Sequence, residues 1–375
     1  MKLLFIAPKT FYPESSGGAQ HSTLYLLKQL QKRHWDIRVL CRTSPLSDHS
    51  FKNKLSALLP PLAKEDTELG FPCKRCLILP SKVVVGILIE KYWWRRLIDK
   101  ELSNFMPDLV LGDFLANDPI FKRAINAGIP CIKFIRSLPV VGVPSIIPEE
   151  LNILGNSPYS AAVAQAITGQ PHEYILPFVD ADSYKTARNA NGKITFINPT
   201  PQKGVDIALE IAKRMPGYSF LFVMGKWAGL RKKVMINFIK SAQKLSNVQI
   251  VENQSDMRKV YADTKILLVP SQFIETFGRV IREAQLNGIP VVASDVGGIS
   301  YAMGKGGIMI KPKNDIHAYI KALRSLSGDK DKYKQYYDLA LENANRKEFD
   351  PEFQFNKFLN YALRITQKEL KADHQ

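Results

Sequence analysis

The densest group of residues with chemical potential lies at positions 270–284, where the chain reads PSQFIETFGRVIREA. Glu275 and Glu283 are separated by seven residues, and Gly278 lies between them. The segment joins a predicted strand that ends at Val269 to a predicted helix. A glycine at such a corner lets the backbone approach a phosphate, and the free N–H groups of a helix start bind anions. The pattern therefore suits a nucleotide sugar, with the diphosphate at the helix start, the sugar at Glu275 and the ribose at Glu283.

Other kinds of catalytic centre are not favoured by the sequence. It has no histidine pair, Ser–His–Asp order or P-loop, which argues against metalloproteases, triad hydrolases and kinases. It has no paired acidic motif for a divalent ion, so we expect no metal site and no cofactor. Cys73 and Cys76 form a CxxC pair, but two further zinc ligands are not nearby. A strand with one cysteine on each face is the favoured interpretation, and a metal or redox site is the alternative.

Two stretches of the chain alternate between predicted strands and helices. The strands of the first stretch are predicted at residues 2–7, 37–41, 109–111 and 129–135. Those of the second are predicted at residues 193–198, 219–224, 248–251, 266–269 and 290–294. Such alternation predicts an α/β protein with two doubly wound parallel sheets. We expect an N-terminal lobe over residues 1–172, a second lobe over residues 173–350, and a closing helix over residues 351–375.

The segment at 270–284, with the NGIPVVAS run and the Gly297-Gly298 pair that follow, resembles the retaining enzymes of glycosyltransferase family 4. Glu275 and Glu283 look like the glutamate–seven residues–glutamate signature of the family's donor site. The resemblance extends to Gly17-Gly18-Ala19-Gln20, Asn156-Ser157, the segment from Ile175 to Asp180 and the helix from Pro351. It implies the GT-B fold, in which two Rossmann-like lobes face each other across a cleft and the last helix crosses back to the first lobe.

The resemblance also implies roles for individual residues. Lys203 precedes Gly204 at a position where family members carry a lysine that stabilises the leaving diphosphate, since a cation offsets the charge that builds on the departing phosphate. Lys203 and Glu275 are therefore the catalytic candidates. The donor-binding candidates are Gly17, Gly18, Asn198, Phe277, Gly278, Arg279, Val280 and Glu283.

Two positions depart from the family's pattern. Asn198 stands where many members have an arginine, and Arg279 or Lys226 is expected to supply the cation that it lacks. Arg136 stands where many members have a histidine that contacts the sugar, so it binds an acidic sugar or an acceptor phosphate, or it is structural. The candidates on the acceptor side are Asp113, for which a helix cap is the alternative, Arg136 and His21.

The net charge of +17 is concentrated in two parts of the chain. Residues 1–100 have seventeen basic and eight acidic side chains, and residues 201–250 have nine and two. Such a surface predicts an anionic partner, and without a nucleic-acid recognition motif we expect a membrane surface with a lipid-linked or phosphorylated acceptor. The KYWWRR run at 91–96 could form an interfacial helix, but buried tryptophans beside solvated arginines are the favoured interpretation.

We therefore expect a retaining, metal-independent hexosyltransferase that moves a sugar from a nucleoside diphosphate to an acceptor hydroxyl. The expected setting is the synthesis of bacterial glycans, lipopolysaccharide or glycolipids. A GT-B protein that binds a nucleotide sugar without transferring it is the alternative. Residues 1–9 resemble a first strand more than a signal peptide, and no run of 18 apolar residues occurs. The expected location is the cytoplasm, with peripheral association at the inner face of the membrane.

Overall fold

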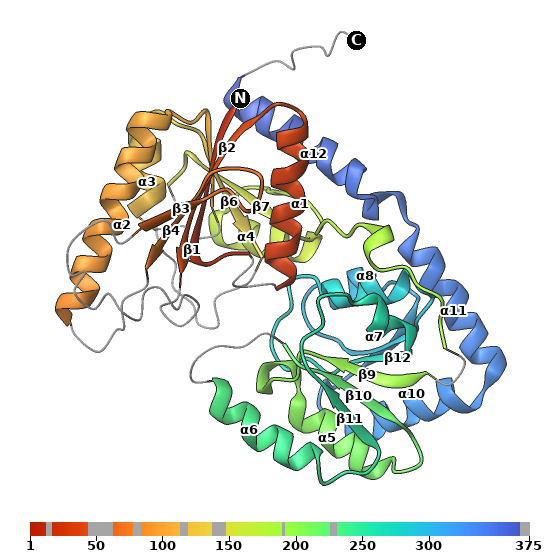
Figure 1. Cartoon of the computed structure of the whole chain (residues 1–375). Helices are drawn as coiled ribbons and strands as arrows, with labels where there is room; N and C mark the ends of the chain where they lie inside the picture. Colours follow the sequence, from red (N-terminus) through yellow and green to blue (C-terminus); the bar gives the residue numbers. More distant parts are fainter. Residues whose placement is uncertain are drawn as a thin grey trace. The chain divides into compact units, whose positions relative to one another are not determined.

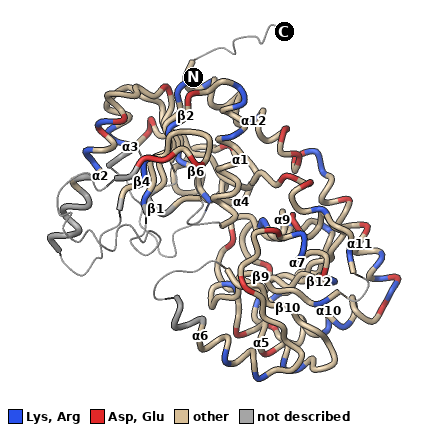
Figure 2. Tube along the Cα trace, viewed as in Figure 1, with Lys and Arg blue, Asp and Glu red and all other residues tan. Residues whose placement is uncertain are grey.

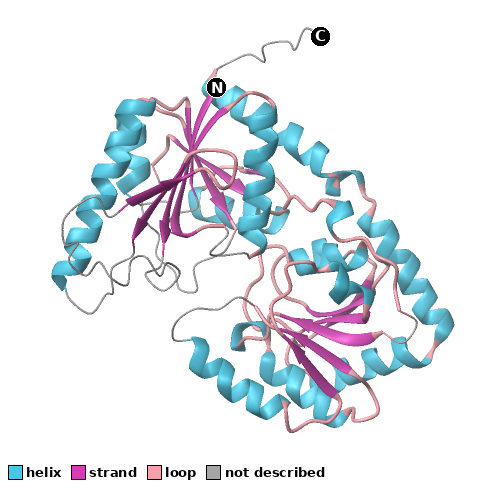
Figure 3. Ribbon diagram, in the orientation of Figure 1, coloured by secondary structure: helices cyan, strands magenta, loops and turns pink. Residues whose placement is uncertain are grey.

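The computed structural model describes residues 1–12, 17–43, 63–77, 84–112, 119–136, 148–189, 192–225 and 231–367. The chain forms two compact units, each built on a sheet (Figures 1 and 3). The N-terminal unit comprises Met1–Asn156, Ala161–Ile175 and Phe355–Gln375. The C-terminal unit comprises Ser157–Ser160 and Leu176–Gln354. Helix α12 (Pro351–Thr366) therefore begins in the C-terminal unit and continues in the N-terminal one.

The N-terminal unit has, in its described residues, one eight-stranded sheet with the order β3-β4-β2-β1-β5-β6-β7-β8. Only the pair of β3 and β4 is antiparallel among these strands. The strands are β1 (Lys2–Thr10), β2 (Asp36–Thr43), β3 (Ala63–Asp66), β4 (Cys73–Leu77), β5 (Leu109–Gly112), β6 (Cys131–Ile135), β7 (Leu151–Gly155) and β8 (Glu173–Tyr174). The helices are α1 (Gly18–Lys32), α2 (Val84–Phe105), α3 (Pro119–Asn126) and α4 (Pro158–Thr168). Ser157 and the start of α4 are grouped with the C-terminal unit.

The core of the N-terminal unit explains the apolar strands seen in the sequence. Leu4 of β1 and Val110 of β5 pack with Trp94 of α2 in one buried cluster. Strands that are buried on both faces in this way need nearly continuous apolar runs. Trp94 is buried while Arg95 and Arg96 are exposed, as the favoured interpretation predicts. The Trp93 side chain lies outside the described residues, and none of the described helices has the length and apolar character that a membrane crossing requires.

The cysteines of the CxxC pair lie on opposite faces of β4, as the favoured interpretation predicts. Cys73 Sγ is 3.7 Å from Cys41 Sγ on the neighbouring strand β2. Cys76 instead packs in the cluster of Leu4 and Trp94. Both thiols are buried, and burial raises the pKa of Cys76 to about 11, which leaves it a protonated core residue.

The C-terminal unit has, in its described residues, a six-stranded sheet with the order β11-β10-β9-β12-β13-β14, and every pair is parallel. The strands are β9 (Lys193–Ile197), β10 (Phe220–Val223), β11 (Val248–Val251), β12 (Thr264–Val269), β13 (Val291–Ser294) and β14 (Gly307–Ile310). The α-helices are α5 (Val205–Arg214), α6 (Arg231–Ala242), α7 (Arg258–Ala262), α8 (Arg279–Gln285), α9 (Ile299–Met303), α10 (Ile316–Gly328) and α11 (Lys330–Ala344). Short 3-10 turns are η2 (Ala181–Ser183), η3 (Pro201–Lys203) and η4 (Lys347–Phe349).

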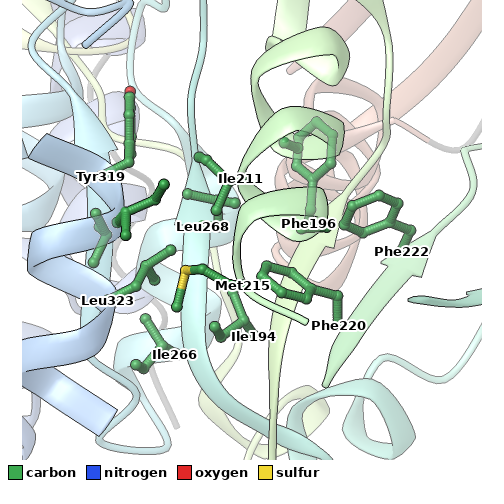
Figure 4. Close-up of a cluster of buried hydrophobic side chains, with 14 of the residues drawn as sticks. Ile194, Phe196, Ile211, Met215, Phe220, Phe222, Ile266, Leu268, Tyr319 and Leu323 are labelled. Carbon is green, nitrogen blue, oxygen red and sulfur yellow. The ribbon is translucent and has the colours of Figure 1, made fainter. Parts of the chain in front are cut away.

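The larger of two buried apolar clusters among the described residues of this unit packs helices α5 and α10 against the second sheet. Phe196 of β9 and Phe222 of β10 meet Ile211 of α5, and Leu323 of α10 lies in the same cluster (Figure 4). Full burial of a side chain of this size contributes about 1.5–3 kcal/mol. Strands β9, β12 and β13 are neighbours, so the loops that follow them meet at one edge of a rigid sheet. In open α/β sheets this carboxyl edge is where ligands bind.

Candidate functional site

Two loops at the carboxyl edge of the second sheet bring the catalytic candidates together. One follows β9 and includes η3, which ends at Lys203, and the other follows β12 and carries Glu275. The Lys203 ammonium donates a hydrogen bond to Glu275 Oε1 and forms an ion pair with it. Ser271 Oγ donates to the same oxygen at 3.0 Å, and the Phe273 ring centroid lies 4.9 Å from Lys203 Nζ. A cation and a carboxylate, 72 positions apart in the chain, thus share one small site.

Close backbone contacts fix the positions of these two loops. The N–H of Gln272 donates to the Gln202 carbonyl oxygen at 2.9 Å. Gly204 has a φ of +82°, and a Cβ there would lie 1.9 Å from the Pro270 carbonyl oxygen. Only glycine satisfies both conditions without displacing a loop.

A second glycine contact supports Glu275 from the loop that follows β13. The Gly298 N–H donates to the Glu275 carbonyl oxygen at 2.7 Å, and a Cβ on Gly298 would lie 2.1 Å from the Thr276 carbonyl oxygen. Ser157 Oγ donates to that same Thr276 carbonyl oxygen. The main chain on either side of Glu275 is therefore held from two sides.

Glu283 lies in a polar network inside the same unit. It is 6% exposed, and Tyr261 Oη donates to its Oε2 at 2.7 Å. Arg279 Nε forms an ion pair with its Oε1 at 3.0 Å, and Arg279 Nη2 donates to Tyr184 Oη at 2.7 Å. Burial raises the pKa of the Glu283 carboxyl, while the arginine and both tyrosine hydroxyls oppose that rise. Three intramolecular partners already occupy this carboxylate, and its remaining lone pair leaves capacity for a further hydroxyl.

The other donor-side candidates differ in what they offer. Gly278 has a φ of +90° and precedes α8, which has no side-chain cap at its first turn. The Phe277 side chain is buried, so its main chain rather than its ring is available to a ligand, and Val280 is half-buried. Arg279 is committed to Glu283 and Tyr184, and Lys226 lies outside the described residues.

Asn198 combines two features that are unusual for a structural residue. It follows β9 with a φ of +64°, a left-handed conformation that costs energy for any residue other than glycine. Its Oδ1 atom is buried and has no hydrogen-bond partner. A buried polar atom without a partner at the carboxyl edge of a parallel sheet makes Asn198 a candidate for contact with a ligand.

The acceptor-side candidates belong to the N-terminal unit. Arg136 Nη1 donates to the Ala19 carbonyl oxygen at 2.6 Å and also to Thr23 Oγ1, so this guanidinium links the end of β6 to the first turns of α1. His21 lies on the same helix, and its ring centroid is 5.6 Å from that of Tyr12. Gly17 and Gly18 begin the helix, and Asp113 lies outside the described residues. The structure thus brings the glycine pair, His21 and Arg136 to the start of α1.

Several supporting residues were not identified as functional from the sequence. Tyr184 and Tyr261 contact Glu283 from segments 99 and 22 positions away, and no local pattern marks them. Ser271 stands inside the PSQFIE run, four residues before the carboxylate that it contacts, which is the one local signal available.

Comparison with known protein families points in the same direction. Residues 193–342, the span that contains Lys203, Glu275 and Glu283, match the family model described as Glycosyl transferases group 1. The chain is also similar to the D-inositol 3-phosphate glycosyltransferase of Nocardia farcinica, with 29% identity over 208 residues. That alignment covers 53% of this chain and 43% of the relative, so the chain matches less than half of the relative's length.

Solved structures match the chain over nearly its whole length. HepE of Anabaena, in complex with UDP and glucose, has a TM-score of 0.72 at 19% identity, covering 96% of this chain and 99% of that one. The sucrose-phosphate synthase of Thermosynechococcus elongatus has a TM-score of 0.75 at 14% identity, covering 98% and 100%. At such identities the similarity shows the fold. The chain therefore has the GT-B fold, and the part of it that carries both glutamates and Lys203 matches the group 1 glycosyl transferases.

Proposed function

We propose that the protein is a retaining glycosyltransferase of family 4 that transfers a sugar from a nucleoside diphosphate to an acceptor hydroxyl. The observation that carries this proposal is the contact between Lys203 and Glu275, supported by Ser271. In the free protein the ammonium and the carboxylate neutralise each other. When a donor binds, the ammonium turns to the leaving diphosphate and the carboxylate to the sugar hydroxyls.

The proposed reaction needs no side chain as a nucleophile. The acceptor oxygen forms a bond to the anomeric carbon while the bond from that carbon to the diphosphate oxygen breaks. The acceptor's proton passes to the departing phosphate, on the face from which that group leaves. A cation placed before the reaction stabilises the charge that builds on the phosphate, so we propose that Lys203 does this and that the transfer needs no divalent ion.

The second glutamate and the departure at Asn198 fit a donor with a nucleoside. Glu283 has a lone pair left for a ribose hydroxyl, and its three protein partners fix its orientation. Asn198 offers an unpartnered oxygen in place of the family's arginine, so it accepts a hydrogen bond from a donor hydroxyl and supplies no charge to the diphosphate. UDP is the nucleotide in the HepE complex, so uridine is the first nucleoside to test.

The acceptor belongs to the N-terminal unit in this proposal. The name of the Nocardia relative includes inositol 3-phosphate, and phosphorylated or lipid-linked acceptors agree with the basic excess of residues 1–100. Arg136 is tied to α1, so we assign it to the support of the glycine pair rather than to direct contact with the acceptor. We place the protein in the cytoplasm, at the inner face of the membrane, in bacterial glycan or glycolipid synthesis.

A screen of nucleotide sugars by thermal unfolding, followed by assays of turnover, tests the proposal. A donor at about 100 times its Kd stabilises the folded protein by about 2.7 kcal/mol, which a melting curve detects. We expect Lys203→Ala and Glu275→Gln each to lower kcat about 10²–10³-fold, the usual loss when one transition-state contact is removed. Lys240→Ala, on the exposed face of α6, is the control and should keep full activity.

Each outcome of this experiment decides between specific alternatives. Full activity in both variants would show that neither Lys203 nor Glu275 contributes to catalysis. Donor binding without turnover on any acceptor pool would support a protein that binds a nucleotide sugar and does not transfer it. If no nucleotide sugar shifts the melting curve, the proposed function is wrong.

A further inference from the structure

The segment that leaves the C-terminal unit contacts the candidate site through one aromatic side chain. Helix α11 ends at Ala344, the turn η4 ends at Phe349, and the chain joins the N-terminal unit between Gln354 and Phe355. Phe349 is 3% exposed, although it lies in a short connection between two helices. A connection of this kind normally runs over the surface with its side chains in water.

Three separate segments of the site converge on Phe349. Its ring centroid lies 6.0 Å from that of Phe277 and 6.2 Å from that of Tyr301, with interplanar angles of 85° in both cases. The Arg282 guanidinium lies 5.1 Å from the same centroid. Edge-to-face aromatic pairs and a desolvated cation over a ring are both directional, so they fix orientation as well as distance.

Each of these three residues lies close in sequence to Glu275, to Glu283 or to the glycine that supports Glu275. Phe277 comes two positions after Glu275, and Arg282 comes directly before Glu283. Tyr301 belongs to α9, which starts immediately after Gly298, whose N–H binds the Glu275 carbonyl oxygen. One ring therefore touches the loop that carries Glu275, the helix that carries Glu283, and the helix that begins at the support of Glu275.

Hydrogen bonds also tie the connecting segment, residues 344–354, to helices α8 and α9. Arg282 Nη1 donates to the Ala344 carbonyl oxygen at the end of α11, and its Nη2 donates to the Phe349 carbonyl oxygen at 3.3 Å. Arg346 Nη2 donates to the Tyr301 carbonyl oxygen at 2.9 Å. Gln354 Oε1, at the boundary of the unit, accepts from the N–H of Leu176 at 2.9 Å. Residues 176 and 354, which both lie at boundaries between the units, are thus tied to each other.

We propose that Phe349 is a positioning residue that fixes the positions of Glu275 and Glu283 relative to each other. It touches neither carboxylate and acts through Phe277, Arg282 and Tyr301. The proposal rests on the proposed function for the meaning of the two carboxylates, and on the contacts above for the linkage itself. Because a misplacement of about 1 Å costs up to about 10²-fold in rate, even a small shift of this ring is measurable.

Phe349→Leu tests the linkage, and Phe238→Leu is its matched control. Phe238 is 5% exposed, belongs to the same unit and pairs with Phe222 at a centroid distance of 5.8 Å, in the core far from the glutamates in sequence. Both substitutions remove one buried ring from an aromatic pair, so we expect similar losses of thermal stability. Only Phe349→Leu should speed amide hydrogen exchange across residues 275–283 relative to the rest of the unit.

Kinetics give the second measurement. We expect Phe349→Leu to lower kcat/KM about tenfold at temperatures where both variants are folded, with Phe238→Leu within about twofold of the parent protein. Equal exchange across 275–283 in the two variants would overturn the linkage. If the parent protein binds no nucleotide sugar, the proposed function fails by itself, and the exchange comparison still decides whether Phe349 positions the two segments.

Discussion

Glu283 is the residue at which the environment matters most. A carboxylate so deeply buried is costly unless it is paired and hydrogen-bonded. Here an arginine and two tyrosines supply those partners from three segments of the C-terminal unit. The network keeps the carboxylate in one orientation, which is what a ribose-binding role requires.

Tyr261→Phe should destabilise the protein in a way that depends on pH. The folded pKa of Glu283 lies above the unfolded value of 4.5, so the folded state binds more protons between those two values, and stability falls as pH rises through that window. The Tyr261 hydroxyl stabilises the charged form of Glu283, so removing it raises the pKa of Glu283 further. The loss of stability with rising pH then extends to higher pH. We expect a destabilisation of about 1.5–3 kcal/mol at pH 8 and a smaller one at pH 5, measured by urea unfolding.

Tyr319→Phe is the control for this measurement. Tyr319 is also fully buried in the C-terminal unit, but its hydroxyl donates to the Lys313 carbonyl oxygen at 3.2 Å and not to a carboxylate. Its effect should be the same at both pH values. A Tyr261→Phe effect equally independent of pH would show that Tyr261 does not act on the ionisation of Glu283.

At the scale of elements, the site depends on two loops that touch through their main chains. The loop after β9 and the loop after β12 belong to neighbouring parallel strands, so the sheet brings them to one edge. Gly204 then allows the contact with Pro270 that brings Lys203 to Glu275. Lys203 itself sits at the end of a 3-10 turn that Thr200 caps.

Gly204→Ala should separate the two loops. The new Cβ would meet the Pro270 carbonyl oxygen, and the positive φ adds strain, so we expect a loss of about 3 kcal/mol or more in the free energy of unfolding. Donor affinity should fall with it, because Lys203 and Glu275 no longer meet. Thermal unfolding with and without the donor measures both effects.

Gly217→Ala provides the comparison within the same unit. A Cβ at Gly217 has no heavy atom within 4 Å, so its effect should stay within about 1 kcal/mol and leave donor affinity unchanged. Wild-type stability and donor affinity in Gly204→Ala would contradict the role given to this contact.

At the scale of the whole molecule, the sequence gives the number of basic residues, and the structure shows which of them are exposed. Lysines and arginines occur in both units (Figure 2). Some are internal to the fold, such as the buried Arg75, which donates to Asp66 Oδ2 at 2.6 Å. Others are exposed, such as Arg95 and Arg96 on α2. Only the exposed ones are available to an anionic surface.

We expect the protein to float with vesicles that contain anionic lipid at low ionic strength, and to lose that binding as salt is raised. Arg95→Glu with Arg96→Glu should weaken the binding, since Tyr92, which is 54% exposed, and these two arginines share one exposed part of α2. Lys240→Glu with Lys244→Glu makes the same change of charge in the other unit and should have less effect. Absence of binding at low salt would exclude the membrane surface as a partner.

The sequence by itself determined nine strands of the two sheets up to residue 294, the spacing of the two glutamates and the position of Lys203. These features are local, because apolar runs, glycines at corners and short spacings express the geometry of one segment. The antiparallel β3, the short strand β8, the last strand β14 and helices α6, α10 and α11 were not predicted. Tertiary structure alone decided that Lys203 meets Glu275, that two distant tyrosines hold Glu283, and that Phe349 reaches Phe277 and Arg282. Those contacts depend on which loops the parallel sheet brings to one edge and on which side chains fill the space there, and neither is encoded in any single stretch of the chain.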